Sequence, residues 1–318
     1  MGTRGSGPIL FPPGLRQSVL ATGLGCCLAA PASALVPYVY IPGEEELEAS
    51  ALSIAQAAAQ VLQIGYLEDA ASLADLSVRL APANVQSWLL LAAARLRNRD
   101  SAAAKEALAQ AKLLDTDNAG IWFAEGSLAM ASDDFPHAEA LIRRGLELDP
   151  ENANAYFDLG NALFLQARGE EALAAFQEAS AKQEDLWPAI NNEGLVLYEA
   201  DQPEAAMERW RQAIAINDQV AEPVLALAAA LYNQGDQSQV TIGMAIRALD
   251  QESDYAEEAF QESQLWGEKL RAATRRLFMD SRLQSALERA LSMVNLRRLE
   301  QDSTPLLPEE DSTLPQSP

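Results

Sequence analysis

The sequence is poor in the side chains that most enzymes use for chemistry. It holds one histidine, His137, and two cysteines, Cys26 and Cys27, both within the first 34 residues. Without residues 1–34 the chain would contain no thiol, which excludes disulfides, cysteine nucleophiles, and metal sites built from several Cys or His ligands. His137 is predicted on the outer face of a helix, where it would lack the positioned partner that general-base catalysis needs.

Motifs for bound cofactors are also missing. No Gly-rich loop could cradle a phosphate, and acidic clusters such as Asp133-Asp134 lack the alternating ligands and turn Gly of a calcium loop. We therefore expect no enzyme activity, no cofactor and no metal.

Long apolar runs are absent, and the N-terminus carries only a short one. Two Arg without any acid precede about thirteen small or apolar residues, and Ala32-Ser33-Ala34 follows. That order predicts a signal peptide over 1–34, because the apolar run is short for a permanent membrane helix. The alternatives are an uncleaved anchor and, with a poorer motif fit at Leu24-Gly25-Cys26, a lipoprotein signal.

Positive charge is scarce in the rest of the chain. Beyond residue 34 there are 21 basic and 46 acidic residues, a formal charge of −25. Such a surface repels polyanions, so we expect no nucleic-acid partner. Solubility is the simpler interpretation of the excess acid.

Small residues recur every 34 positions, and this repeat is the strongest signal in the sequence. One column is Ala70, Ala104, Ala138, Ala172 and Ala206; a second is Ala58, Ala92, Gly126, Gly160, Gly194 and Ala228. A third column of small residues and a column of large apolar residues keep the same step. Chance does not hold several columns in register over five or six periods.

The repeat resembles the tetratricopeptide repeat family, whose 34-residue unit has an aromatic residue, Leu-Gly, Ala, Phe and Pro at set offsets. The unit at 153 shows this best, with Tyr156, Leu159-Gly160, Ala172 and Phe176. The resemblance implies an all-α, right-handed superhelical solenoid of antiparallel helix pairs that stack because neither helix can bury its apolar stripe alone. Small residues are then expected where the paired helices approach closely.

The register gives a domain plan. Five clear units open at about Ala51, Val85, Ala119, Ala153 and Trp187, and a degraded sixth opens at Ala221. We predict a signal peptide at 1–34, an extended lead-in at 35–44, the solenoid at 45–250, C-terminal capping helices at 251–298, and a disordered acidic, Pro-rich tail at 299–318.

The resemblance also implies a binding groove, because the first helix of each pair lines the concave surface in this family. On that surface the chain offers large apolar groups and amides where a solvated face would be charged. The predicted groove residues are Leu89, Leu96, Phe123, Met130, Phe157, Asn161, Phe164, Asn191, Asn192, Leu195, Tyr198 and Tyr232. The alternative is that these side chains only pack against neighbouring helices.

Two of the amides suggest how a client could be held. Family members that bind a chaperone's C-terminal carboxylate use two Asn at the places of Asn161 and Asn192, together with Lys or Arg at three further places. Here those three places hold Phe157, Glu222 and Ala226, so carboxylate binding is not expected. The amides could still anchor a peptide main chain, or they could simply tie adjacent helices together.

The C-terminal helices are the exception to the acidic balance. Residues 264–298 contain eight basic and three acidic residues. They could bind an anionic membrane surface, or they could cover and pair with the end of the acidic solenoid.

The sequence thus predicts an exported scaffold or assembly factor that binds a protein or peptide client, with a membrane-surface tether as the alternative. Its organisation is similar to that of exported cyanobacterial members of the family linked to photosynthetic membranes, so the periplasm or the thylakoid lumen is the expected location. The oligomeric state does not follow from the sequence.

Overall fold

The computed structural model describes residues 42–302, and every regular element in that range is a helix. The paired helices are α1 Glu44–Gln63, α2 Leu67–Leu80, α3 Val85–Arg97, α4 Ser101–Leu114, α5 Ala119–Met130, α6 Phe135–Leu148, α7 Ala153–Leu165, α8 Gly169–Lys182, α9 Trp187–Glu199, α10 Pro203–Ile216, α11 Ala221–Asn233 and α12 Gln239–Gln251. The predicted all-α class is confirmed. No helix among the described residues is both long enough and apolar enough to cross a membrane.

Beyond the pairs, the chain continues as a C-terminal segment of shorter and longer helices. These are η1 Ser253–Ala256, α13 Glu258–Ser263, α14 Glu268–Phe278, η2 Ser281–Leu283 and α15 Gln284–Asp302. The predicted tail at 299–318 therefore begins too early, because α15 is still helical at Asp302. The predicted signal peptide at 1–34, the lead-in up to residue 41 and the tail from 303 onward lie outside the described residues.

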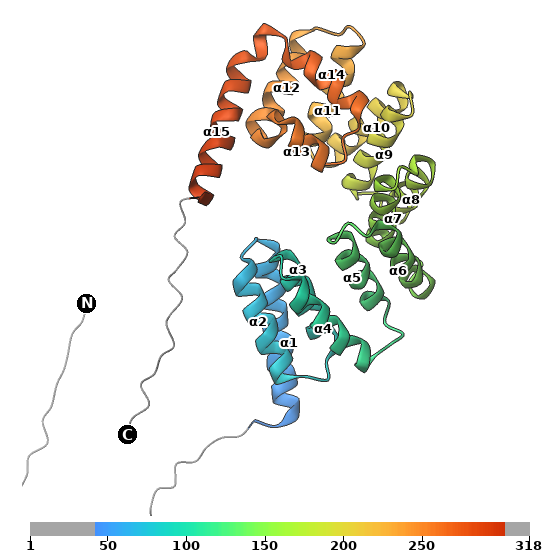
Figure 1. Cartoon of the computed structure of the whole chain (residues 1–318), viewed down its shortest axis with the longest axis vertical. Helices are drawn as coiled ribbons and strands as arrows, with labels where there is room; N and C mark the ends of the chain where they lie inside the picture. Colours follow the sequence, from blue (N-terminus) through green and yellow to red (C-terminus); the bar gives the residue numbers. More distant parts are fainter. Residues whose placement is uncertain (1–41, 303–318) are drawn as a thin grey trace, which may run out of the picture. The chain divides into compact units, whose positions relative to one another are not determined.

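The helix pairs follow the 34-residue register. The first helices α3, α5, α7, α9 and α11 begin at the residues where the register placed the openings of its units, and each packs against the second helix that follows it (Figure 1). The sixth pair departs from the pattern, since α12 begins at Gln239 instead of the register position 237. Its buried face is displaced by one residue: Thr241, Ala245 and Ala248 stand 35 positions after Ala206, Trp210 and Ala213, so the small-residue columns slip in this unit.

Capping side chains fix where the first helices start. Asn84, Asn118 and Asn152 stand at the N-caps of α3, α5 and α7, and their side-chain oxygens accept backbone N–H groups at 3.0 to 3.1 Å. An amide oxygen there satisfies one of the N–H groups that the first helical turn leaves unpaired. The caps therefore recur over three successive repeats, whereas α9 and α11 start without a side-chain cap hydrogen bond.

The turn between the two helices of each pair is left-handed at one residue. That residue is Gly65 in the first pair and Gly235 in the sixth, and the four pairs between them use Arg99, Asp133, Ala167 and Asp201 with φ between 56° and 62°. A side chain at such an angle costs about 1 kcal/mol or more. The turn geometry is therefore kept even where the sequence does not supply glycine.

The glycine column makes room for large side chains of the paired helix. A methyl group at Gly160 would lie 2.5 Å from the ring of Phe176, and one at Gly194 would lie 2.5 Å from the indole of Trp210. Gly126 is opposed by Ile142 in the same way, at 2.7 Å. The sequence predicted a close approach at these positions. In the structure, the backbone of the first helix approaches a bulky side chain that stands sixteen positions later in the chain.

Candidate functional site

The predicted groove residues divide into two groups. Eight are partly exposed: Leu89, Leu96, Phe123, Met130, Phe157, Asn161, Phe164 and Tyr232. Four from α9 are buried: Asn191, Asn192, Leu195 and Tyr198. The expectation of an open groove over α9 is therefore wrong.

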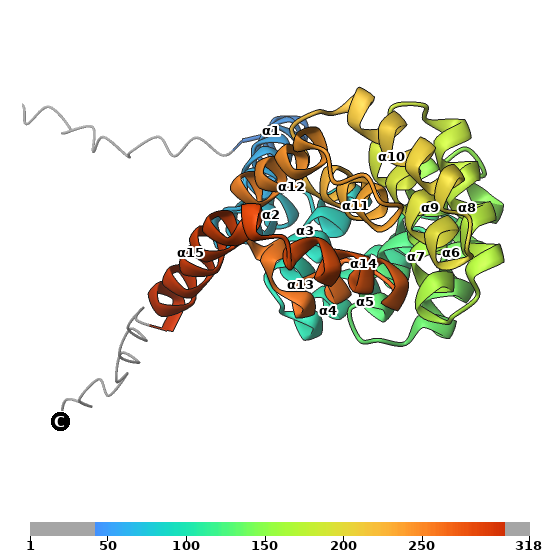
Figure 2. The ribbon, with the colours of Figure 1, turned by 90° about the horizontal axis from the view of Figure 1, so that it is seen from above.

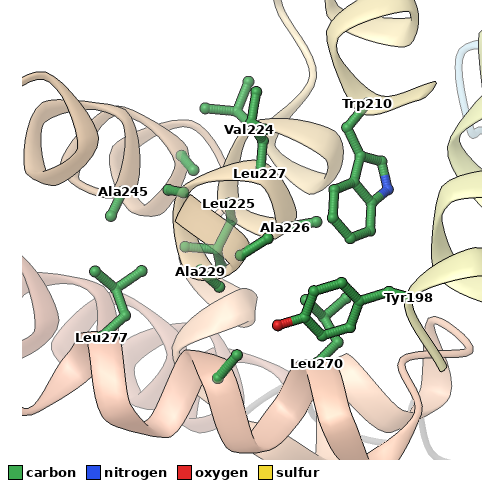
Figure 3. Packing of buried hydrophobic residues seen from close by; sticks show 14 of the residues in the cluster. Tyr198, Trp210, Val224, Leu225, Ala226, Leu227, Ala229, Ala245, Leu270 and Leu277 are labelled. Atoms are coloured by element: carbon green, nitrogen blue, oxygen red, sulfur yellow. The ribbon is translucent and has the colours of Figure 1, made fainter. Parts of the chain in front are cut away.

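The chain's own C-terminal segment covers this part of the face. Helix α14 packs against α11 and α9, and in Figure 3 Leu270 and Leu277 project from α14 toward α11. Tyr198 lies between Leu270 and the indole of Trp210, with the two ring centroids 5.7 Å apart. Leu195 and Tyr198 thus belong to the core that α14 completes. Figure 2 shows α14 beside α11, which it contacts.

Polar contacts hold the segment in place at the C-terminal end of α9 and at the first turn of α11. The carboxylate of Glu199 accepts the backbone N–H groups of Lys269 at 3.2 Å and Leu270 at 3.0 Å, in the first turn of α14. An anion at that position suits the positive end of the helix dipole. At the other end of the same face, Nε1 of Trp266 donates to Oε1 of Glu222 at 3.0 Å.

One prediction within the partly exposed group is also corrected. Phe123 was expected to face the groove, yet its ring packs on α6. A methyl group at Gly145 would lie only 2.3 Å from that ring, so Phe123 serves the packing of its own helix pair.

A cavity of about 400 Å³ remains open beside the covered region, and we call it the asparagine cavity. Its lining comes from α5, α7, α9, α11 and the loop before α14. The lining residues are Met130, Phe157, Asn161, Leu165, Trp187, Pro188, Asn191, Asn192, Glu222, Ser263, Gln264 and Leu265. The cavity therefore brings together five of the twelve predicted groove residues.

Three amides form a ladder along one wall of the asparagine cavity. Nδ2 of Asn192 donates to Oδ1 of Asn161 at 3.0 Å, and Nδ2 of Asn191 donates to Oδ1 of Asn192 at 3.1 Å. The first of these bonds joins α9 to α7, so the amides do tie adjacent helices together. Oδ1 of Asn191 is buried and has no hydrogen-bond partner within residues 42–302. A buried acceptor left unpaired is costly, so the ladder ends at a group that a ligand could satisfy.

The carboxyl groups of Glu222 and Asp158 have raised pKa values. Burial raises the pKa of Glu222 to about 7, although hydrogen bonding with Trp266, Asn191 and Tyr255 acts in the opposite direction. Burial likewise raises the pKa of Asp158 to about 6. Asp158 stands 34 residues before Asn192, at the equivalent place on α7, and no hydrogen bond or ion pair of its side chain is found among the described residues.

A larger cavity, of about 1050 Å³, is lined by α4, α5 and α6. Apolar side chains such as Leu108, Leu113 and Leu141 line it, and its charged pair, Lys112 and Glu125, is joined by a 2.8 Å ion pair. None of its buried polar atoms lacks a partner. His137 is exposed at its rim. We take the asparagine cavity as the candidate site because it alone of the two ends in an unsatisfied buried group.

Each basic residue of the C-terminal segment has a polar partner, either in the repeats or within the segment itself. Lys269 contacts Asp201 at 2.6 Å, Arg289 contacts Asp250 at 3.0 Å, and Arg297 contacts Asp254 at 2.9 Å. The other five also have polar partners: Arg271, Arg275, Arg276, Arg282 and Arg298. Pairing with the acidic solenoid has contacts at Lys269, Arg276 and Arg289, whereas Arg271, Arg275, Arg297 and Arg298 pair with acids of the C-terminal segment itself.

No group of three or more His, Cys, Asp or Glu side chains in residues 42–302 is placed to hold a metal ion.

The sequence did not reveal that α14 would lie over α9 and α11. Its apolar positions, including Trp266 and Leu270, indicated a cap on the last repeat but not which face of the repeats would receive it.

Comparisons with known proteins agree with this fold. A tetratricopeptide repeat family model matches residues 129–192. A structure of PilF from Pseudomonas aeruginosa is 17% identical, with 70% of this chain and 99% of that chain covered and a TM-score of 0.57. Yeast Tom70 is 17% identical, with 83% of this chain and 57% of that chain covered and a TM-score of 0.56. The comparison with curated proteins gave no match.

The helix pairs, their 34-residue register and the family match define a helical-repeat protein. More specifically, residues 129–192 match the tetratricopeptide repeat family that the sequence predicted, and the solved structures show the same fold.

Proposed function

We propose that this helical-repeat protein is a non-catalytic scaffold or assembly factor that binds a segment of a client polypeptide in the asparagine cavity and along the adjoining faces of α5 and α7. The covered faces of α9 and α11 are not part of the binding surface. The client would lie against the half of the predicted groove that the C-terminal segment leaves open.

The unpaired Oδ1 of Asn191 is the observation that carries this proposal. It ends a ladder of amides on the wall of an open cavity, and a peptide N–H group is the donor that an amide oxygen commonly accepts. A donor at this position would satisfy an acceptor that is otherwise buried and unpaired.

Apolar side chains beside the ladder could receive the client's side chains. Phe157 and Met130 line the cavity and are partly exposed, and Leu165 is 42% exposed at its edge. Large apolar groups that remain accessible next to a few convergent polar groups are typical of binding sites.

The test is affinity purification of the tagged chain from residue 35 onward, compared with the Phe157→Ala and Asn161→Ala double variant. We expect the proteins recovered with the parent chain to be lost with this variant. Leu113→Ala is the matched control, because Leu113 is 79% exposed on α4 and does not line the asparagine cavity. Melting curves would establish that both variants are folded. Recovery of the same proteins by the folded double variant would refute the proposed site.

Export is also part of the proposal. It is supported by the order of basic, apolar and small residues in 1–34, and an exported client is then expected in the periplasm or the thylakoid lumen. N-terminal sequencing of the protein from its native source tests it, since a start at Leu35 is expected after cleavage and a start at residue 1 or 2 would count against it.

A further inference from the structure

The first helices of the last four repeats carry charge of only one sign. Helices α5, α7, α9 and α11 contain no Lys or Arg, and their five acids are Glu125, Asp158, Glu193, Glu199 and Glu222. The basic residues of these repeats stand on the second helices or in the turns, as Arg143, Lys182 and Arg209 do. The face that the first helices present to a client is therefore acidic without any compensating cation of its own.

Four of these five acids already have partners within the chain. Glu125 pairs with Lys112, Glu193 contacts Ser180 and Arg209, Glu199 caps α14, and Glu222 accepts from the indole of Trp266. Asp158 alone is left without a partner among the described residues, on the face that includes the amide ladder. Glu222 lines the asparagine cavity, and Asp158 occupies the place on α7 that Asn192 occupies on α9.

The chain's own α14 is one segment that lies on this face, although its Arg271 and Arg275 pair with acids of the C-terminal segment. It is an amphipathic helix with four basic residues and one acid, EKLRAATRRLF. Leu270 and Leu277 supply its buried side, and Lys269 contacts Asp201 and the backbone oxygen of Glu199. Arg276 extends the same pattern through a hydrogen bond to Asn233. A basic amphipathic segment thus already lies on the face of the next two first helices.

We propose that the open part of the face is selective for a basic, partly apolar segment of another protein. This inference rests on the proposed function and specifies the chemistry of its client. A Lys or Arg side chain of the client would pair with Asp158, its main chain would reach the amide ladder, and its apolar side chains would contact Phe157 and Leu165. An acidic client would meet like charge with no cation to receive it.

Selection from a random library of displayed 12-residue peptides tests the inference while the natural client is still unidentified. The parent chain from residue 35 onward is immobilised, and peptides are selected in parallel on Asp158→Asn and on Phe157→Ala. We expect the peptides enriched on the parent chain to be net positive and to contain apolar residues. A synthetic peptide from that pool should bind Asp158→Asn about fivefold more weakly, because one partly desolvated charge pair is lost.

The matched control is Glu178→Gln, which removes the same charge from an exposed position on α8 in the same repeat. It should bind the synthetic peptide as the parent chain does, because Glu178 is not on the first-helix side. Asn at position 158 is not expected to unfold the chain, since Asp158 has no partner to lose. Melting curves of both variants check this directly.

The outcomes separate the two proposals. Enrichment of neutral or acidic peptides that is lost on Phe157→Ala would overturn the charge selectivity and leave the proposed site standing. Enrichment that survives Phe157→Ala, or no enrichment at all, would overturn both. Equal binding of the basic peptide to the parent chain and to Asp158→Asn would also overturn the role given to Asp158.

Discussion

Trp266 and Glu222 are joined by a 3.0 Å hydrogen bond between residues 44 positions apart in the sequence. The bond fixes the loop before α14 to the first turn of α11. The carboxyl group of Glu222 also lines the asparagine cavity. Glu222 is therefore both a contact of the C-terminal segment and a wall of the candidate site.

Glu222 should make the stability of the chain depend on pH. Its pKa is about 7 in the folded chain against 4.5 without burial, so the folded state keeps a proton that the unfolded state releases. This favours folding at low pH, and the advantage is lost as the pH rises from about 4.5 to about 7. Glu222→Gln should remove this dependence, because an amide can still accept from Trp266 without carrying charge.

Urea denaturation at pH 5, 6, 7 and 8 measures the effect. The free energy of unfolding of Glu222→Gln minus that of the parent chain should grow toward pH 8 by up to about 3 kcal/mol, the equivalent of the pKa difference. Asp158 contributes a similar trend to both proteins and therefore cancels. A difference that stays constant across this pH range would contradict the buried, proton-retaining state of Glu222.

Replacing Glu199 by Ala should loosen α14. The carboxylate accepts two backbone N–H groups of the first turn of α14, and loss of such a cap costs about 1 to 2 kcal/mol. Hydrogen exchange of the α14 amides should accelerate accordingly. Glu208→Ala is the control, because Glu208 is exposed on α10 and contacts only Arg211, at 3.6 Å. Unchanged exchange in Glu199→Ala would mean that apolar packing alone holds the segment.

The sequence predicted the repeats well because their determinants are local. Gly160 and Phe176 are close in sequence and recur with their unit, so one period of the pattern contains both sides of the contact. The starts of the first helices have capping residues such as Asn152 for the same reason. A contact that repeats with the sequence can be recognised in the sequence.

The covered half of the groove could not be predicted in this way. Tyr198 occupies a groove position by register, and the register is correct about the face on which it lies. What covers that face is a segment outside the repeats, and the contact between Glu199 and Leu270 spans 71 positions that no periodicity links. The pattern identifies the surface of a repeat, whereas its exposure depends on distant residues.

The steric role of the glycine column predicts opposite effects for two Gly→Ala substitutions. Ala at Gly160 would place a methyl group 2.5 Å from the Phe176 ring, so we expect a loss of about 1 to 3 kcal/mol. Gly243 lies in α12 with no atom within 4 Å of an added methyl group. Ala there should instead stabilise the chain by about 0.5 to 1 kcal/mol, because it limits the unfolded chain and favours helix. Thermal unfolding of the two variants distinguishes packing from propensity, and stabilisation by both would show that the column is not sterically required.

Ala167 offers the reverse experiment, in which glycine should stabilise. Its φ of 59° is a left-handed angle that Gly adopts without strain, as Gly65 and Gly235 do at the equivalent turns. Ala167→Gly should therefore raise the free energy of unfolding by up to about 1 kcal/mol, since relief of the strain exceeds the added freedom of the unfolded chain. Ala57→Gly in the middle of α1 is the control at an exposed helical position, where the same replacement should cost about 1 kcal/mol. If both substitutions destabilise the chain equally, the turn at Ala167 is not left-handed in solution.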